Sequence, residues 1–370
     1  MTEELSHSKI ASNLRLRVLV LKAVILVGGE GTRLRPLTYE VPKSMVPVLN
    51  RPFLEHAIAY LKQYGIDNLI LAMSYLPESF RQYFGDGSKL GAELTYSVED
   101  NPLGTAGAVK NAEEQLTGTF VVLNGDIFTE LDIADMLDFH RRKGAKATIA
   151  LTWVDNPSAF GVVETDSGSR VQRFIEKPPA GQATTNWINA GIYILEPEVL
   201  EHVPASKHYM FEKGVFPLLL ELGEPVYGYP FDGYWLDMGT LEKYLRLNCD
   251  LASLKTNSSL IGNLSKDKLH HGKNVIIQPS AKITGPVIIG DSCRIGSKVH
   301  IKGPVIIGAD CCIADGACLE NAVLWRDVNV GTGATLKQCV VGNNAQLDKN
   351  EQVINCVVTS TASGLLRTEI

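Results

Sequence analysis

The residues best suited to bind phosphate lie in a glycine-rich run, 28–38, near the start of the chain. It reads Gly-Gly-Glu-Gly-Thr-Arg-Leu-Arg-Pro-Leu-Thr and follows the apolar residues 24–27, which predict a buried strand. Glycine lets the backbone approach a ligand closely and point N–H groups at it. Arg33, Arg35 and Lys43 add cations, since arginine grips phosphate bidentately and lysine acts as a point charge. The run therefore indicates a triphosphate site.

Two familiar phosphate-binding signatures are missing from this run. No Gly-Lys-Ser/Thr ends it, so it is not a Walker loop, and G-x-G-x-x-G is absent too. The alternative interpretation is a tight strand-to-helix turn with solvated charges. The three cations at these spacings favour the phosphate site, although Arg35 alone is equally consistent with a surface charge.

The composition sets limits on partners and location. A chain of 370 residues is long enough for about two domains, and its net charge of −6 argues against a nucleic-acid surface. A local cluster of Arg and Lys still suffices for a small anionic substrate. No apolar stretch is long enough to span a bilayer, so no membrane association is expected. Residues 1–21 lack the layout of a secretory signal and are interpreted as an N-terminal extension.

The seven cysteines also bear on location. They all lie between Cys249 and Cys356, are odd in number and include no C-x-x-C pair. This pattern is typical of reduced cysteines, several of them packed as small hydrophobes, in a cytoplasmic protein.

Residues 22–245 alternate short apolar runs, such as 68–73 and 120–123, with segments of helical periodicity, such as 133–143. This alternation predicts βαβ units and an α/β domain with a mostly parallel sheet. Ligands of such sheets bind beyond the carboxyl ends of the strands. Both the glycine-rich run and the tripeptide 124–126, Asn-Gly-Asp, follow predicted strands at such ends.

A different period begins near residue 275. Aliphatic residues recur every six positions without a gap at Ile283, Ile289, Ile295, Ile301, Ile307, Ile313 and Leu319. The period continues with slips through Val330, Leu336, Leu347 and Val353. A six-residue period of inward-facing aliphatic residues predicts a parallel β-helix over 275–370. Residues 246–274 are then interpreted as the connector.

Several sequence blocks in order resemble the sugar-1-phosphate nucleotidylyltransferase family. They are the run 28–38 with Pro-Lys after it, PLGTAG at 102–107, LNGD at 123–126, FIEKP at 174–178, INAG at 188–191 and WLDMGT at 235–240. The resemblance implies a Rossmann-like nucleotidyltransferase domain followed by a left-handed β-helix. The branch that makes GDP-mannose from GTP and mannose 1-phosphate is the most similar. The first 20 residues depart from the family pattern.

The resemblance implies in-line attack of a sugar phosphate oxygen on the α-phosphorus of a nucleoside triphosphate, which releases pyrophosphate. The protein must then position two polyanions and neutralise their charge. The implied cofactor is Mg²⁺, held by Asp126 and Asp237, because this ion combines a few carboxylates with phosphate oxygens and water. A lone aspartate after a strand is also typical of a turn or a helix cap, which is the alternative for both.

The resemblance also assigns the groups that bind phosphate and nucleotide. Arg33 grips the β- and γ-phosphates, Lys43 approaches them from the other side, and Lys177 holds the sugar phosphate. The implied nucleotide contacts are Gly28, Gly29, Gly31, Thr32, Arg33, Glu99, Gly104, Thr105 and Asp126. The alternative for Lys177 is a solvated loop charge before two prolines.

On the sugar side, Glu176 is expected to accept hydrogen bonds from hexose hydroxyls. Asn189 and the backbone N–H of Gly161 complete the implied pocket, with a turn residue before Gly191 as the alternative for Asn189.

Glu99 bears on which base is bound. Guanine offers two adjacent donors that a carboxylate accepts together, whereas uracil and thymine present one N–H between two carbonyls. Glu99 therefore favours GTP, unless it is only a surface charge beside Asp100.

Three rival functions remain at this point. They are a thymidylyltransferase or uridylyltransferase acting on glucose 1-phosphate, a non-catalytic regulatory subunit, and a bifunctional enzyme with an acyltransferase β-helix. The presence of Arg33, Asp126 and Lys177 argues against the regulatory subunit. His300 is the only histidine after residue 275 and lies within the regular period, which argues against the acyltransferase. The β-helix is instead expected to mediate homo-oligomer assembly, because its exposed edges favour burial between subunits.

Overall fold

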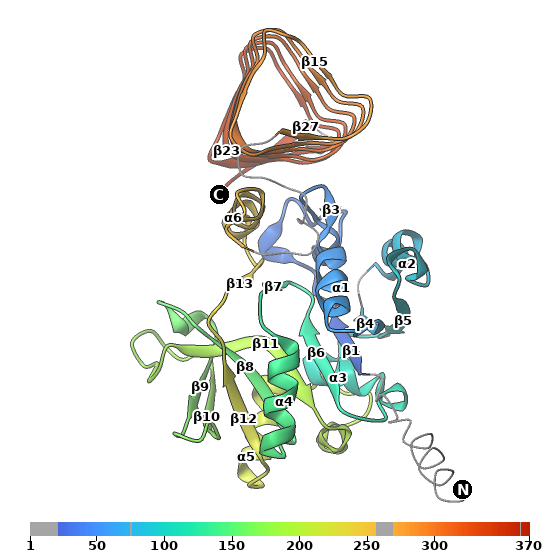
Figure 1. Cartoon of the computed structure of the whole chain (residues 1–370), viewed down its shortest axis with the longest axis vertical. Coiled ribbons are helices and arrows are strands. Elements are labelled where there is room, and N and C mark those ends of the chain that lie inside the picture. Colours follow the sequence, from blue (N-terminus) through green and yellow to red (C-terminus); the bar gives the residue numbers. More distant parts are fainter. Residues whose placement is uncertain (1–20, 75, 257–268, 363) are drawn as a thin grey trace, which may run out of the picture.

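The computed structural model describes residues 21–74, 76–256, 269–362 and 364–370. Figure 1 shows two domains. The first, residues 21–256, has a central sheet and is called the catalytic domain after the expectation above. The second is a β-helix of stacked triangular coils that rests on helix α6 and strand β3 of the first. The predicted N-terminal extension lies outside the described residues, apart from Leu21.

The catalytic domain is built on one mixed sheet with the strand order β10-β9-β11-β6-β1-β4-β5, and with β8 between β11 and β12. Strands β6, β1, β4 and β5 run parallel, and β11 runs antiparallel to both β6 and β8. The predicted α/β class with a mixed, mostly parallel sheet is confirmed. The strands are β1 (Lys22–Leu26), β4 (Asn68–Met73), β5 (Glu93–Val98), β6 (Phe120–Asn124), β8 (Ala147–Trp153), β9 (Gly161–Thr165), β10 (Val171–Glu176), β11 (Trp187–Leu195) and β12 (Val226–Pro230).

Helices cover both faces of this sheet, because alternate residues of each strand point to opposite sides. In β1, Ala23 and Ile25 pack with the residues of α1, α2 and α4, whereas Val24 packs with those of α3 and α5. The result is a three-layer arrangement with an apolar core on each side. The helices are α1 (Phe53–Gln63), α2 (Pro77–Phe84), α3 (Gly104–Lys110), α4 (Ile133–Lys143), α5 (Phe216–Glu221) and α6 (Leu241–Ala252), with short turns at Thr32–Leu34 and Lys43–Met45 and a π-helical turn at Phe211–Val215.

Two small strand pairs complete the domain. Strand β7 (Ile127–Thr129) pairs antiparallel with β13 (Trp235–Asp237), and β2 (Pro47–Val48) pairs with β3 (Arg51–Pro52). In the first pair Asp237 lies opposite Ile127, and the N–H of Met238 donates to the carbonyl of Asp126 at 2.9 Å. This pairing brings two aspartates that are far apart in the sequence to neighbouring backbone positions.

The two predicted ends of the connector differ from the structure. Helix α6, capped by the Thr240 hydroxyl, runs through residue 245 because its apolar residues stay buried as far as Leu251 and Ala252. At the other end, β14 already pairs parallel with β17, so the first coil begins at Leu269 rather than at residue 275. Residues 257–268 of the predicted connector lie outside the described residues.

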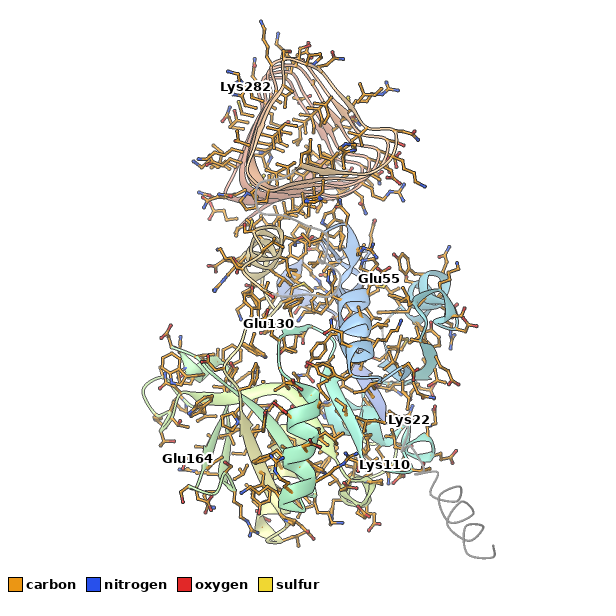
Figure 2. The ribbon with its side chains drawn as sticks, viewed as in Figure 1. Lys22, Glu55, Lys110, Glu130, Glu164 and Lys282 are labelled. Atoms are coloured by element: carbon orange, nitrogen blue, oxygen red, sulfur yellow. The ribbon has the colours of Figure 1, made fainter. Side chains whose placement is uncertain are left out.

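The C-terminal domain is the predicted left-handed parallel β-helix. The six-residue row from Ile289 to Leu319 is buried inside the coils, and Figure 2 shows side chains filling the triangle while Lys282 points outward. Its strands are β14 (Leu269–His271), β15 (Ile276–Ile277), β16 (Lys282–Thr284), β17 (Val287–Ile289), β18 (Arg294–Ile295), β19 (His300–Ile307), β20 (Cys312–Ile313), β21 (Cys318–Leu324), β22 (Asn329–Val330), β23 (Thr335–Val341), β24 (Gln346–Leu347), β25 (Gln352–Ile354), β26 (Cys356–Thr361) and β27 (Gly364–Glu369).

The slips in the period have a structural cause. Val287 pairs with Val305, 18 residues later, but Val305 pairs with Ala322, only 17 residues later. The register shifts between Lys302 and Val305, where one coil loses a residue at its corner. The later coils keep this shorter length, since Leu319 pairs with Leu336 and Leu336 with Val353, so the inward row moves by one position in each coil.

The β-helix docks on the catalytic domain through a second, outward-facing apolar row. Ile306, Val323, Val340 and Val357 are buried in one cluster with α6 residues such as Tyr244. The indole N–H of Trp325 donates to the Tyr244 hydroxyl at 2.8 Å. The two domains thus share a core, with α6 between them.

All seven cysteines are free thiols, of which Cys293, Cys311 and Cys339 are buried. No helix in the described part of the chain is long and apolar enough to cross a membrane.

Candidate active site

Two adjoining cavities open at the carboxyl ends of β1 and β6. The first, of about 340 Å³, is lined by the glycine-rich run and by Lys43, Ser44, Thr105 and Gly239. The second, of about 250 Å³, is lined by residues of β9–β11, β13 and α6 and by Glu212 of the π-helical turn. Arg33, Asn124 and Asp126 line both cavities. A group bound in one cavity can therefore meet a group bound in the other at these three residues.

Each of the two aspartates near this junction is paired with a lysine. The Lys43 ammonium forms an ion pair with the Asp126 carboxylate, and the Lys243 ammonium lies 3.4 Å from Asp237 Oδ2. Lys243 also lies 5.1 Å from the centre of the Phe160 ring. The lysines neutralise carboxylates that line the same cavity, in a partly desolvated cleft where charge interactions are stronger than in water.

Gly239 allows a cation to approach Asp237. A Cβ added at this position would lie 2.9 Å from both Asp237 oxygens and 3.0 Å from an Arg33 guanidinium nitrogen. Any side chain there would push Arg33 and Asp237 apart. The glycine therefore keeps the guanidinium beside the junction of the two cavities.

The two carboxylates fit the requirements of Mg²⁺. This ion is usually held by one or two carboxylates and completes its shell with phosphate oxygens and water. In the described part of the chain no group of three or more His, Cys, Asp or Glu side chains is arranged to hold a metal. Asp126 and Asp237 alone would thus leave most coordination positions to a substrate.

The wall of the second cavity carries Glu176 and Lys177, whose charged groups lie 3.4 Å apart. Gly161 lies opposite Glu176 across the β9–β10 pair, and a Cβ on it would come within 2.9 Å of a Glu176 oxygen. The Trp235 indole N–H donates to the Ala190 carbonyl at 2.9 Å, and its ring packs edge-on against Phe160. This wall combines acceptors, a cation and aromatic rings, a combination suited to a phosphorylated sugar.

Asn189 lies in the same cavity, but both ends of its carboxamide already have protein partners. Its Nδ2 donates to the Tyr193 hydroxyl at 2.8 Å, and its Oδ1 accepts from the N–H of Gly191 at 2.9 Å. Each end keeps one further hydrogen-bonding position for a ligand. The side chain is therefore held in one orientation.

Comparison with known proteins gives the family. Residues 22–253 match the family model described as nucleotidyl transferase, and residues 266–365 match one described as the EIF2B subunit epsilon LbH domain. The chain belongs to the nucleotidyl transferase family. The prediction of a nucleotidyltransferase domain followed by a left-handed β-helix is confirmed by both matches.

Relatives with the same layout include proteins of different base preference. A mannose-1-phosphate guanylyltransferase of Mycobacterium tuberculosis is 38% identical over 85% of this chain and 83% of its own length. A UTP–glucose-1-phosphate uridylyltransferase of Synechocystis sp. is 35% identical over 92% and 93%. The solved structure of HddC from Yersinia pseudotuberculosis complexed with GMP-PN is 30% identical, with a TM-score of 0.54 over 62% of this chain and 98% of that chain.

Most of the predicted site residues line these two cavities of the nucleotidyl transferase domain. Those that do are Gly29, Gly31, Thr32, Arg33, Lys43, Thr105, Asp126, Gly161, Glu176, Lys177, Asn189 and Asp237. The structure does not place Gly28, Glu99 or Gly104 among the lining residues. Gly28 and Gly104 are sequence neighbours of residues that line the first cavity, whereas Glu99 is not.

Glu99 differs most from the expectation, because it is buried rather than open to a ligand. Its carboxylate accepts a hydrogen bond from the N–H of Leu103 at 2.7 Å, which shapes the loop that leads into α3. Burial raises the pKa of Glu99, and the bond from Leu103 opposes that rise. Its role in reading the base stays a prediction.

Sequence reasoning missed three residues of the second cavity that have amide or charged side chains. Asn124 lines both cavities, and its buried Oδ1 has no hydrogen-bond partner in the described structure. Lys243 and Glu212 also line the second cavity. Asn124 belongs to the LNGD block, so that motif could have identified it as a site residue. Lys243 looks like any solvent-facing residue of an amphipathic helix, and Glu212 precedes a lysine in a segment with no motif, so neither had a signal of its own.

Proposed function

We propose that this enzyme transfers guanylyl groups from GTP to mannose 1-phosphate, releasing pyrophosphate and forming GDP-mannose. One observation carries the proposal: a glycine-walled cavity and a sugar-suited cavity adjoin at Arg33 and Asp126, with Asp237 close by. A bond between two phosphorylated substrates would form at such a junction. The family of the chain and its guanylyltransferase relatives support the same reaction class.

The first cavity is suited to the triphosphate. Backbone N–H groups of Gly29, Gly31 and Thr32 would bind phosphate oxygens, with Arg33 gripping the β- and γ-phosphates. Lys43 would leave Asp126 and move to the phosphates. The departing pyrophosphate would then be stabilised by fixed cations, whose effect is largest where charge develops.

The second cavity is suited to the sugar phosphate. Lys177 and Lys243 would hold its phosphate, while Glu176 and Asn189 would bind hexose hydroxyls. Without such cations two polyanions would repel each other. Holding them at close range lowers the barrier mainly by orientation.

Mg²⁺ is the proposed cofactor, with Asp126 and Asp237 as its protein ligands. When bound, it would neutralise phosphate charge and hold the α-phosphoryl group for in-line attack. The β7–β13 pair would set the spacing of the two aspartates, and Arg33 would remain near Asp237 because Gly239 carries no side chain.

The preference for guanine and mannose rests on the relatives and on Glu99. The carboxylate of Glu99 has lone pairs beyond the one that Leu103 uses, so it can still accept the two adjacent donors of guanine. It would reach the base only if the loop before α3 adjusts.

The direct test is pyrophosphate release by the purified full chain with Mg²⁺, crossing GTP, dTTP, UTP, ATP and CTP with mannose 1-phosphate and glucose 1-phosphate. Fastest turnover with GTP and mannose 1-phosphate is expected. Faster turnover of UTP or dTTP with glucose 1-phosphate would refute the proposed specificity and favour the activity named for the Synechocystis relative. No turnover with any pair of substrates would refute the proposed nucleotidyl transfer activity.

We also propose that the protein is cytoplasmic and forms a homo-oligomer through the β-helix. Ile276 and Ile354 are exposed on that domain, and burying them between subunits would remove apolar surface from water. Light scattering coupled to gel filtration is expected to give a multiple of the 40.4 kDa chain mass. A single-chain mass at micromolar concentration would refute the oligomer.

A further inference from the structure

A buried carboxylate lies between the two cavities and belongs to neither set of predicted contacts. Glu212 is only 8% exposed, yet it lines the second cavity. It stands in the π-helical turn Phe211–Val215, whose geometry is rare and often found at functional sites. Burying a charge is costly unless it is hydrogen-bonded, so the partners of this carboxylate are informative.

The partners of Glu212 come from opposite sides. Its Oε2 accepts from the Thr105 hydroxyl at 2.8 Å, and its Oε1 accepts from the Tyr193 hydroxyl at 3.1 Å. Thr105 lines the first cavity only, at the start of α3. Tyr193 is fully buried and in turn accepts from Asn189 of the second cavity. One continuous chain of hydrogen bonds therefore runs from Thr105 through Glu212 and Tyr193 to Asn189.

Every bond in this chain has a fixed direction if Glu212 is ionised. A carboxylate only accepts, so both hydroxyls must donate to it, and the Tyr193 oxygen is then left to accept from Asn189. Burial raises the pKa of Glu212, while the bonds from Thr105 and Tyr193 favour the charged form and oppose the rise. The directions fix which end of the Asn189 carboxamide faces Tyr193, and so which atoms it offers to a ligand.

We propose that Glu212 is a positioning residue that couples the nucleotide cavity to the hexose cavity, through Thr105 on one side and Tyr193 and Asn189 on the other. The inference rests on the proposed division of the site into a nucleotide side and a sugar side. Nucleotide bound against α3 would hold Thr105 in one orientation. The chain of hydrogen bonds through Glu212 and Tyr193 would then keep Asn189 oriented to bind the hexose. The sugar phosphate would thus bind best after the nucleotide.

Two isosteric variants test this. Tyr193→Phe removes the link to Asn189, and about a ten-fold rise in KM for the hexose 1-phosphate is expected because a buried polar group loses its partner. Thr105→Val is expected to raise the same KM by about five-fold, although Thr105 does not line the hexose cavity. In the double variant the two increases in KM for the hexose 1-phosphate should not multiply, because both substitutions interrupt the same chain of hydrogen bonds. Thr105→Ser, which keeps the hydroxyl, should restore the wild-type KM.

Separate measurement of KM and kcat distinguishes a loss of substrate positioning from a loss of folded protein. A loss of binding shared by ground state and transition state raises KM and spares kcat, whereas a smaller folded fraction lowers kcat alone. Thr148→Val is the matched control, because it removes another buried hydroxyl, bonded to His140 at 2.8 Å, away from both cavities. It should leave the hexose 1-phosphate KM unchanged.

The measurements use whichever nucleotide and hexose 1-phosphate the wild type turns over fastest. An unexpected pair would thus refute the proposed specificity without touching this inference. Calorimetric titration of hexose 1-phosphate, with and without the nucleoside monophosphate, gives the same comparison without turnover. An unchanged hexose 1-phosphate affinity in Thr105→Val, or rises that multiply in the double variant, would overturn the coupling role of Glu212.

Discussion

The β-helix and the catalytic domain bury their side chains in different ways. The inward row of the β-helix is aliphatic residues, alanine and cysteine throughout. In the described part of the chain, the buried polar and charged residues all precede residue 257, among them His56, Glu99, His140 and Glu212. A uniform apolar core favours one rigid shape, whereas buried polar groups need specific partners and fix specific orientations. The β-helix therefore contributes mainly stability, whereas the catalytic domain holds the buried polar groups that a binding site needs.

The largest expected effect comes from removing a metal-binding carboxylate in the catalytic domain. Asp126→Asn should lower kcat by about 10³-fold or more, since electrostatic stabilisation at the reacting phosphates is lost. The melting temperature should hardly change, because the partly exposed side chain supports no core packing. Asp138→Asn, on the exposed face of α4, is the control and should retain full activity in the same pyrophosphate assay. Near-normal turnover of Asp126→Asn would remove this residue from the site.

The converse change is expected in the β-helix. Ile307→Ala leaves a cavity in the inward row and should cost about 2–5 kcal/mol of unfolding free energy, with kcat unchanged below the melting temperature. Urea unfolding and the activity assay check the two parts. Leu366→Ala is the control, because that side chain of the same domain is 38% exposed and its loss should be nearly neutral. If Ile307→Ala lowers kcat without lowering the free energy of unfolding, the claim that the β-helix contributes stability but not catalysis is wrong.

The pH dependence of stability should arise in the catalytic domain. Burial lowers the pKa of His56 from 6.5 to about 4, so the unfolded chain binds a proton between these values that the folded chain does not. Stability should be constant above about pH 6.5 and fall below it, by about 2 kcal/mol at pH 5 from this group. In His56→Gln, which can still donate to the Val48 carbonyl, urea unfolding at pH 7 and pH 5 should show a smaller difference than in the wild type. An equal difference in both proteins would assign the dependence to other groups, such as His140.

A smaller effect is expected at the boundary of the two domains, where α6 presents Lys243 to the site. Lys243→Met should raise KM for the sugar 1-phosphate by about ten-fold and spare KM for the nucleotide, because one contact to a phosphate is lost. Lys213→Met, an exposed lysine next to Glu212, is the control. Steady-state kinetics with each substrate varied in turn measures both values. Equal KM rises for both substrates would indicate a general loss of positive charge rather than a contact on the sugar side.

The contrast between the repetitive β-helix and the catalytic domain also explains which features could be predicted from the sequence. The inward row from Ile283 to Leu319 was evident because each coil repeats one contact, and a repeat is visible in a single sequence. The outward row through Ile306 and Val323 was missed, because its function depends on α6, which lies far away in the sequence. Asp126 and Asp237 were named as metal ligands from their motifs, and that role stays a prediction. The pairing of β7 with β13, which brings them together, could not be predicted from periodicity.

Buried polar groups were the hardest to interpret from sequence. Glu99 was expected to read the base, with a surface charge as the alternative, yet the structure buries it and bonds it to Leu103. Glu212 reads as half of a solvated Glu-Lys pair, and its partners Thr105 and Tyr193 come from other elements. Such roles follow from tertiary contacts that no local pattern encodes.

Direct metal binding tests most sharply whether two distant strand ends make one catalytic centre. Mn²⁺ titration followed by electron paramagnetic resonance, with the preferred nucleotide present, should show a bound ion in the wild type. The affinity should fall by about ten-fold or more in both Asp126→Asn and Asp237→Asn, since each removes one of only two carboxylate ligands. Unchanged Mn²⁺ affinity in either variant would contradict the assignment and place the metal elsewhere.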